Sequence, residues 1–136
     1  MAIMKNKMMK ILVVDDEETI CNLLDEFLSQ MDYQVKIATN GQEAIKKVED
    51  EKPDIVLLDV KMPGITGIDV LGKIKNIDRN IGIIILSAFG DSGIIRDAMQ
   101  LGADYYLEKP MKLEFLMQLL LAWQENHEFE FKIKIK

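Results

Sequence analysis

The chain has 136 residues, of which 49% are hydrophobic and 29% are charged, and its formal net charge is −6. These values fit one soluble globular domain with a tail and exclude a disordered chain or two independent cores. The acidic balance and the dispersed basic residues exclude a nucleic-acid-binding surface, and the single cysteine, Cys21, excludes an internal disulfide and a cysteine-based metal site.

The domain repeats one pattern, in which a short apolar strand precedes an amphipathic helix. The first strand, 11–14, is apolar throughout and ends in an acidic pair, and a helix with apolar residues at helical spacing follows it. The other predicted strands are 34–38, 55–58, 81–86 and 105–107, and the other helices begin at Gly41, at Gly67, after Ser92 and at Leu113. Five such units predict a three-layer α/β/α domain. Its parallel sheet is doubly wound, with strand order 2-1-3-4-5 and a flavodoxin-like topology.

The residues before the first strand include no apolar segment of the signal-peptide type, and no apolar run is long enough to cross a bilayer. We therefore expect a cytoplasmic protein without membrane contact. We divide the chain into an N-terminal extension (1–9), the domain (10–126) and a tail (127–136).

Polar side chains stand where four of the predicted strands end. Asp15 and Asp16 follow the first strand, Asp59 ends the third, Ser87 ends the fourth, and Lys109 comes just after the fifth. In such sheets ligands bind beyond the carboxyl ends of the strands. Two carboxylates about 5 Å apart repel by roughly 3 kcal/mol at an effective dielectric near 20, which a divalent cation offsets. Because Mg²⁺ completes its shell with phosphate oxygens, we predict a magnesium-dependent phosphoryl site.

Each residue type has a part in that chemistry. Asp59, alone at the end of the central strand, is the predicted nucleophile that forms an aspartyl-phosphate. The acidic pair is the predicted metal-binding edge, while the Ser87 hydroxyl and the Lys109 ammonium donate to phosphoryl oxygens. Each residue alone is more often a helix cap or a solvated loop residue. The combination at successive strand ends is the specific feature.

Four segments carry a resemblance to a known family. Residues 13–17 (VVDDE), 57–64 (LLDVKMPG), 86–88 (LSA) and 108–110 (EKP) resemble response-regulator receiver domains, in order and over residues 8–125. The residues of these segments are most similar to those of single-domain relay regulators of the sporulation type and of receivers of the nitrogen-regulation type. The resemblance implies a signalling switch that receives phosphate on Asp59 from a sensor histidine kinase or a histidine phosphotransfer protein. It implies no enzyme activity beyond self-phosphorylation and self-dephosphorylation.

The resemblance also implies the ligands of the metal. Mg²⁺, with Mn²⁺ as a substitute, is expected on Asp16, Asp59 and the backbone carbonyl of Lys61, with Asp15 helping mainly through water. Lys109 is expected to bridge to the phosphorylated Asp59.

Further residues are assigned by the same resemblance. It implies a cis peptide bond before Pro110, and a switch in which Tyr106 swings inward when the phosphoryl group draws the Ser87 hydroxyl. The face formed by the fourth helix, the fifth strand and the fifth helix then changes shape. Lys61 and Phe89 are expected to flank the phosphoryl group, and bulky Phe89 to impede an attacking water, so that the phosphorylated state is long-lived.

The last helix and the tail have more apolar surface than one core requires. The helix has two predicted apolar stripes, one facing the core (Leu113, Leu116, Met117, Leu120, Leu121) and one free (Phe115, Leu119, Ala122, Trp123). Residues 128–136 alternate between charged and apolar, which predicts a strand. Antiparallel pairing with a second copy would oppose unlike charges. We predict a homo-oligomer contact through the free stripe and the tail, with a flexible end or a linker as the alternative.

Other functions remain open. A nucleotide-binding enzyme is disfavoured because the glycine-rich phosphate-binding motifs are absent. A haloacid-dehalogenase-like phosphatase would need a second acid where Lys61 stands. A receiver-like interaction module without phosphorylation is the more serious alternative.

Overall fold

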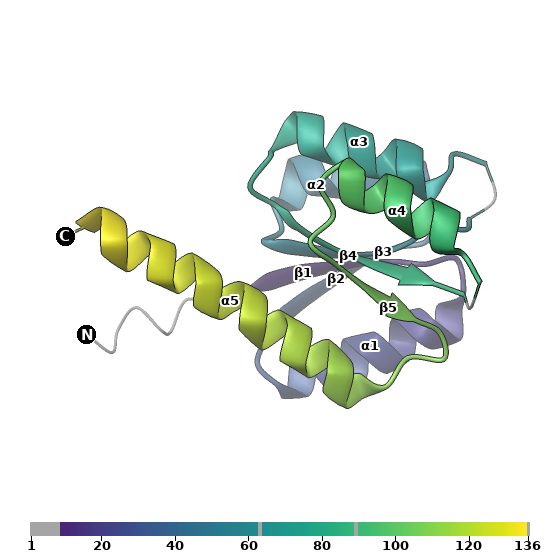
Figure 1. Ribbon diagram of the computed structural model, residues 1–136. Coiled ribbons are helices and arrows are strands. Elements are labelled where there is room, and N and C mark those ends of the chain that lie inside the picture. Colours follow the sequence, from purple (N-terminus) through teal and green to yellow (C-terminus); the bar gives the residue numbers. More distant parts are fainter. Residues whose placement is uncertain (1–8, 63, 89, 136) are drawn as a thin grey trace.

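Five strands and five helices alternate along the part of the chain that is described (Figure 1). The computed structural model describes residues 9–62, 64–88 and 90–135, with residues 127–135 described by their backbone alone. The strands are β1 (Lys10–Val14), β2 (Gln34–Ala38), β3 (Ile55–Asp59), β4 (Gly82–Ser87) and β5 (Tyr105–Glu108), and the helices are α1 (Glu18–Gln30), α2 (Gly41–Glu51), α3 (Gly67–Ile77), α4 (Ser92–Gln100) and α5 (Leu113–Ile135). The predicted N-terminal extension lies, except for its last residue, outside the described residues.

The strands form one parallel sheet in the order β2-β1-β3-β4-β5, which confirms the predicted doubly wound topology. Helices α1 and α5 cover one face, and α2, α3 and α4 cover the other (Figure 1). The register pairs Asp59 with Leu86, and Ser87 with Glu108. The carboxyl ends of β3, β4 and β5 therefore meet at one edge.

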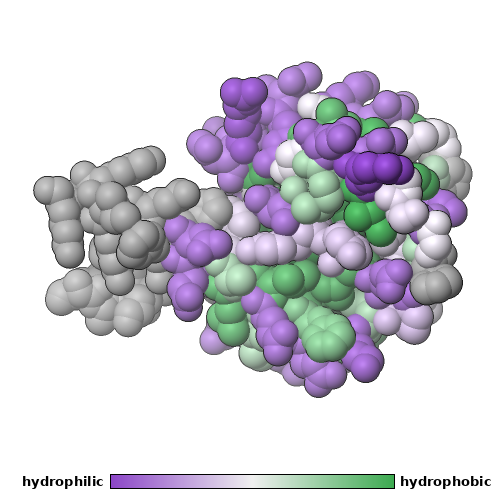
Figure 2. Space-filling view, viewed as in Figure 1, coloured by the Kyte–Doolittle hydropathy of each residue, from purple (hydrophilic) through white to green (hydrophobic). Residues whose placement is uncertain are grey.

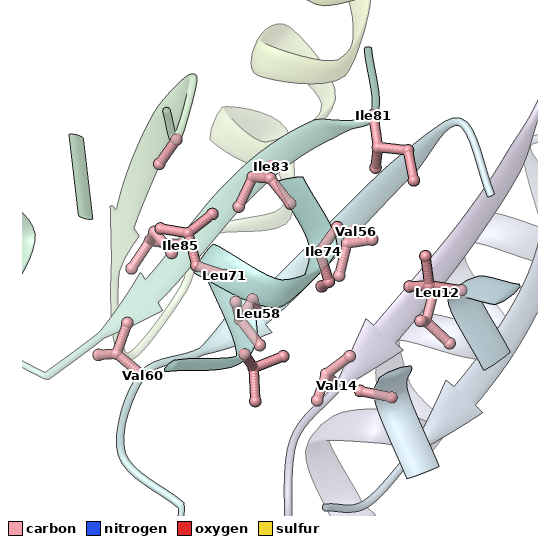
Figure 3. Close-up of a cluster of buried hydrophobic side chains, with 14 of the residues drawn as sticks. Leu12, Val14, Val56, Leu58, Val60, Leu71, Ile74, Ile81, Ile83 and Ile85 are labelled. Atoms are coloured by element: carbon pink, nitrogen blue, oxygen red, sulfur yellow. The ribbon is translucent and has the colours of Figure 1, made fainter. Parts of the chain in front are cut away.

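Alternate residues of the central strands enter two separate hydrophobic clusters. The cluster beneath α2, α3 and α4 includes Leu12, Val14, Val56, Leu58, Ile83 and Ile85 (Figure 3). The cluster beneath α1 and α5 takes the intervening residues, Ile11, Val13, Ile55, Leu57, Ile84 and Leu86. A strand buried on both faces has no polar side, which explains why these segments read as continuous apolar runs.

The start of α3 is fixed close to the end of β3. The Gly67 N–H donates to the Val60 carbonyl at 3.2 Å, and a Cβ at Gly67 would lie 2.4 Å from the Cα of Val60. Only glycine permits this approach. The contact holds the chain just beyond Asp59 in a defined path.

The buried face of α5 differs from the one that the two predicted stripes implied. Trp123, assigned to the free stripe, is buried, and a Cβ on Gly82 would lie 2.6 Å from its Nε1 atom. Leu121, assigned to the core, is 52% exposed, as Phe115 is at 51%. Leu116 and Leu120 are buried as predicted. A helix that is apolar nearly all round does not specify its buried face, so the shape of the sheet beneath it decides.

The predicted strand in the tail is wrong, because α5 continues to Ile135 and projects beyond the sheet (Figure 1). Helix elongation adds one hydrogen bond for each residue that is fixed, once the costly nucleus exists. An isolated strand has no partner for its backbone groups. The alternation in the sequence was therefore outweighed by the helix that precedes it. Within the described ranges, none of the helices combines the length and apolar character needed to cross a membrane.

The buried face of α5 can be tested with two truncations. Trp123→Ala should lower the free energy of unfolding by about 3–5 kcal/mol, because it leaves a cavity in a packed cluster. Leu121→Ala, on the exposed face, should change it by less than about 0.5 kcal/mol. Urea unfolding should be followed by far-UV circular dichroism, since Trp123 is the only tryptophan. Equal losses in the two variants would contradict this packing.

Candidate functional site

Three predicted metal ligands lie together at the carboxyl edge of the sheet. Asp15 and Asp16 stand in the β1–α1 connection and Asp59 ends β3, and carboxylate oxygens of the three lie within 4.8 Å of one another. Asp15 and Asp59 are buried, whereas Asp16 is exposed. The parallel register produces this convergence. The cluster therefore has a buried base and one side open to solvent.

Lys109 supplies the positive charge at this edge. Its Nζ atom lies 2.8 Å from Asp15 Oδ2, 3.4 Å from Asp59 Oδ2 and 3.3 Å from Glu17 Oε1. Its backbone N–H donates to the Ser87 carbonyl at 2.7 Å, and the Lys109–Pro110 peptide bond is cis, as the resemblance implied. The lysine thus bridges two buried carboxylates from different strands.

Ser87 is buried at the end of β4, and its hydroxyl oxygen has no hydrogen-bond partner within the described part of the chain. A buried hydroxyl without a partner costs about 1–3 kcal/mol. Such groups commonly mark a site that a ligand completes. Ser87 ends β4, which lies between β3 with Asp59 and β5, just before Lys109. A hydroxyl at this place can donate to an anion bound at the same edge of the sheet.

Burial and charge set the titration of the two central groups. Burial raises the pKa of Asp59 to about 6, together with the negative charge of Asp15. The hydrogen bond from the Lys61 N–H to Asp59 Oδ1, at 3.1 Å, and the charge of Lys109 act in the opposite direction. Burial lowers the pKa of Lys109, but its hydrogen bond to Asp15 and the charges of Asp59 and Asp15 outweigh burial, so that this pKa is raised. Lys109 is therefore held in its charged form.

The residues present fit a hard divalent cation. One lysine faces three carboxylates, which leaves negative charge uncompensated, and oxygen donors are what Mg²⁺ prefers. The exposed Asp16 provides an open side for waters and for phosphoryl oxygens.

The remaining predicted residues lie around this cluster. Tyr106 is on β5 and its side chain is exposed, while its neighbour Tyr105 packs into the core beneath α5. The Lys61 side chain pairs with Asp91, a residue that was not predicted from the sequence. Phe89 lies outside the described residues, so its assigned effect on lifetime stays a prediction.

Two acidic residues near the site were missed. Glu17 contacts Lys109, and buried Asp91 contacts Lys61. Both residues stand a few positions after the end of a strand, and this position in the sequence could have marked them as candidates for the site. Their partners could not have been predicted, because these lie in other connections and the spacing of residues along the sequence does not determine the path of a connection.

Comparison with known proteins decides the family. Residues 11–121 match the response regulator receiver domain. The chain is a receiver domain of that family. It is 43% identical over 105 residues to sporulation initiation phosphotransferase F of Bacillus subtilis, covering 77% of this chain and 85% of that protein. It is 36% identical over 112 residues to the chemotaxis protein CheY of Thermotoga maritima, covering 82% and 93%.

Solved receiver structures agree with this assignment. A receiver domain from Clostridium thermocellum superposes with a TM-score of 0.85 at 31% identity, covering 90% of this chain and 98% of that one. NtrX from Brucella abortus gives a TM-score of 0.86 at 26% identity, with 93% of this chain covered. This chain spans 29% of the length of that NtrX chain.

The receiver family explains the convergence at the sheet edge. Receiver domains accept phosphoryl groups in two-component and phosphorelay signalling, and they interact with histidine kinases or phosphotransfer proteins and with downstream targets. This receiver is a phosphoacceptor of that kind. The family generally binds Mg²⁺ at an acidic pocket, which matches the cluster of three aspartates. The phosphatase and the passive-module alternatives are not favoured.

The raised pKa of Asp59 predicts a pH dependence of stability. The pKa of about 6 in the folded protein exceeds the ordinary value of 3.8 for an aspartate, so the native state binds more protons between these two pH values. Stability therefore falls as pH rises through this window. Asp59→Asn removes the effect and should be more stable than the wild type at pH 7 by about 1–2 kcal/mol in metal-free buffer.

The measurement is urea unfolding with a chelator between about pH 4.5 and pH 7.5, a range that begins between the two pKa values and ends above them. The difference between the variant and the wild type should grow as the pH rises to about 6 and level off above about pH 7. Asp50→Asn, which removes an exposed carboxylate, should run parallel to the wild type. A constant difference between Asp59→Asn and the wild type would contradict the raised pKa.

Proposed function

We propose that Asp59 is the residue that accepts the phosphoryl group, from a phosphohistidine of a sensor kinase or a histidine phosphotransfer protein in the cytoplasm. The observation that carries this proposal is the convergence of Asp59, Lys109 and the Ser87 hydroxyl, which has no partner among the described residues, at one edge of the sheet. An Asp59 carboxylate oxygen attacks phosphorus while the bond from phosphorus to the donor imidazole nitrogen breaks. The imidazole leaves with that electron pair. We propose no enzyme activity beyond this self-phosphorylation and self-dephosphorylation, in which water attacks phosphorus, phosphate leaves and the Asp59 carboxylate is regenerated.

The chain's own residues prepare this transfer. Asp15, Asp16, Asp59 and the carbonyl of Lys61 would hold Mg²⁺, with Mn²⁺ as a substitute. When bound, the cation offsets the negative charge on the transferring oxygens. Lys109 is already 3.4 Å from Asp59 Oδ2 and can turn toward a phosphoryl oxygen on that residue.

The switch is proposed to start at Ser87. A phosphoryl group adds about −1.5 to −2 charge and three acceptor oxygens, so it offers an acceptor to the buried hydroxyl, which has no partner in the described part of the chain. Movement of Ser87 changes the space beside β5, and Tyr106 then turns inward from its exposed position. The α4–β5–α5 face carries the signal. Lys61 and Phe89 are proposed to tune how long the phosphoryl group persists.

Phosphoryl transfer to Asp59 can be followed by intact-protein mass spectrometry. With Mg²⁺ and acetyl phosphate the wild type should gain one phosphoryl group, and Asp59→Asn should gain none. Omission of Mg²⁺ should also prevent the gain. Asp97→Asn, which removes an exposed carboxylate on α4, should behave as the wild type does. A wild type that stays unmodified, or a phosphorylated Asp59→Asn, would contradict the proposal.

A second copy of the chain is the proposed occupant of the exposed face of α5. Phe115 and Leu121 leave apolar surface uncovered there. In the part of α5 that carries hydropathy colours, hydrophobic residues reach the surface beside a few hydrophilic ones (Figure 2). The strand pairing predicted for the tail cannot supply this contact, because the backbone through Ile135 is helical. Packing of one α5 against another remains as the proposed contact.

Light scattering of the protein as it elutes from a size-exclusion column tests this contact. The wild type should form a dimer at high protein concentration, and Phe115→Glu with Leu121→Glu should be a monomer because charge would be buried. Leu23→Glu, at a similarly exposed site on α1, is the matched control and should remain dimeric. A monomeric wild type at every concentration would end this proposal.

A further inference from the structure

An ion pair joins the two connections that flank the acceptor site. Lys61 Nζ lies 3.0 Å from Asp91 Oδ1, and the Asp91 side chain is 8% exposed, against 60% for Lys61. The other oxygen of Asp91, Oδ2, accepts from the Ala88 N–H at 3.2 Å. One nearly buried carboxylate therefore connects the β3–α3 connection with the β4–α4 connection.

Asp91 does not use its side chain in the way that its position favours. It is the N-cap residue of α4, where an aspartate ordinarily accepts from the second or third helical N–H. No such bond forms here. The side chain instead turns back toward the end of β4 and outward to Lys61. Its contacts thus fix the connection that leads into α4, and not the first turn of α4 itself.

Helix α4 is loosely anchored behind this connection. Ala98 is its one fully buried residue, and Ile94 packs only partly against the core. A surface hollow of about 520 Å³ lies beside the ion pair, lined by Ile94 and by Lys61, Met62 and other residues of the β3–α3 connection and α3. Elements with few buried apolar contacts move at low free-energy cost. The start of α4 therefore has both room to shift and little packing to oppose a shift.

The residues that Asp91 contacts stand next to the two reacting positions. Lys61 is two residues beyond Asp59, and its N–H donates to Asp59 Oδ1. Ala88 directly follows Ser87, whose hydroxyl has no hydrogen-bond partner among the described residues. We propose that the Lys61–Asp91 ion pair is a latch that holds the β4–α4 connection in its resting position, and that a phosphoryl group on Asp59 opens it by competing for the Lys61 ammonium. This inference rests on the proposed function of Asp59.

Charge determines the direction of that competition. The phosphoryl group carries about −1.5 to −2 charge, against −1 for Asp91. The lysine side chain is long and flexible, and its ammonium behaves as a point charge that can turn between two anions. When Lys61 leaves, Asp91 keeps only the Ala88 N–H, and Ala88 and Ser87 are free to move together toward the phosphoryl group.

The test uses Asp91→Asn, which removes the charge and keeps an oxygen that can accept from Ala88. Hydrogen exchange by mass spectrometry should show amides of residues 88–95 exchanging about fivefold faster than in the wild type without any phosphoryl analogue. Titration with beryllium fluoride and Mg²⁺ should show half-saturation at about fivefold lower concentration, because the latch no longer opposes the bound state. Asp97→Asn is the matched control, because it removes the same charge from an exposed position on α4, and it should match the wild type in both measurements.

A double variant tests the pair itself. Lys61→Met should accelerate exchange over 88–95 as Asp91→Asn does, and the two together should add nothing further, because either change breaks the same contact. Amides of β3 serve as the internal measure of global stability. Exchange in Asp91→Asn equal to that in Asp97→Asn, or additive effects in the double variant, would overturn the latch. A wild type that ignores beryllium fluoride would count against Asp59 as acceptor, while the exchange of the unliganded variants would still report on the latch.

Discussion

The repulsion between buried carboxylates at the end of the sheet is the constraint on which the site depends. Asp15 and Asp59 are both removed from water, and an unpaired buried charge is strongly destabilising. Lys109 contacts both and is the reason that they can remain close. The backbone pairing of the sheet places β1, β3 and β5, and Lys109 offsets the charge that this arrangement gathers at their carboxyl ends.

The core supplies the rigidity that this arrangement requires. The central strands are buried on both faces, so a shift in their register would move every side chain to the opposite cluster. The close approach of Gly67 to Val60 adds a backbone contact immediately beyond Asp59. The Asp59 carboxylate is thus held by a fixed strand and a fixed helix start. Helix α4, by contrast, has only Ala98 fully buried among its described residues, so its start is the part best able to shift.

Much of this arrangement could be predicted from the sequence, because parallel strands joined by helices follow a small number of rules for their order and for the place of the ligand site. Apolar runs separated by amphipathic helices determined the sheet order, and the strand ends identified Asp15, Asp59 and Lys109 without knowledge of any contact. The contact between Lys61 and Asp91 could not be predicted in that way, since it depends on the paths of two connections. The prediction of a strand in the tail was wrong for another reason. The alternation of charged and apolar residues is typical of a strand, but the preceding turns of α5 provide a helical end from which the helix elongates.

The resting state and the phosphorylated state satisfy different polar groups. At rest, Lys61 and Ala88 bind Asp91, while the Ser87 hydroxyl has no partner within the described residues. In the proposed phosphorylated state, the phosphoryl group is an acceptor for Ser87 and attracts Lys61 away from Asp91. Each of the two states therefore has a contact that the other lacks. A ligand shifts such an equilibrium only by its differential affinity for the two states, and a charged group on Asp59 has that difference through both contacts.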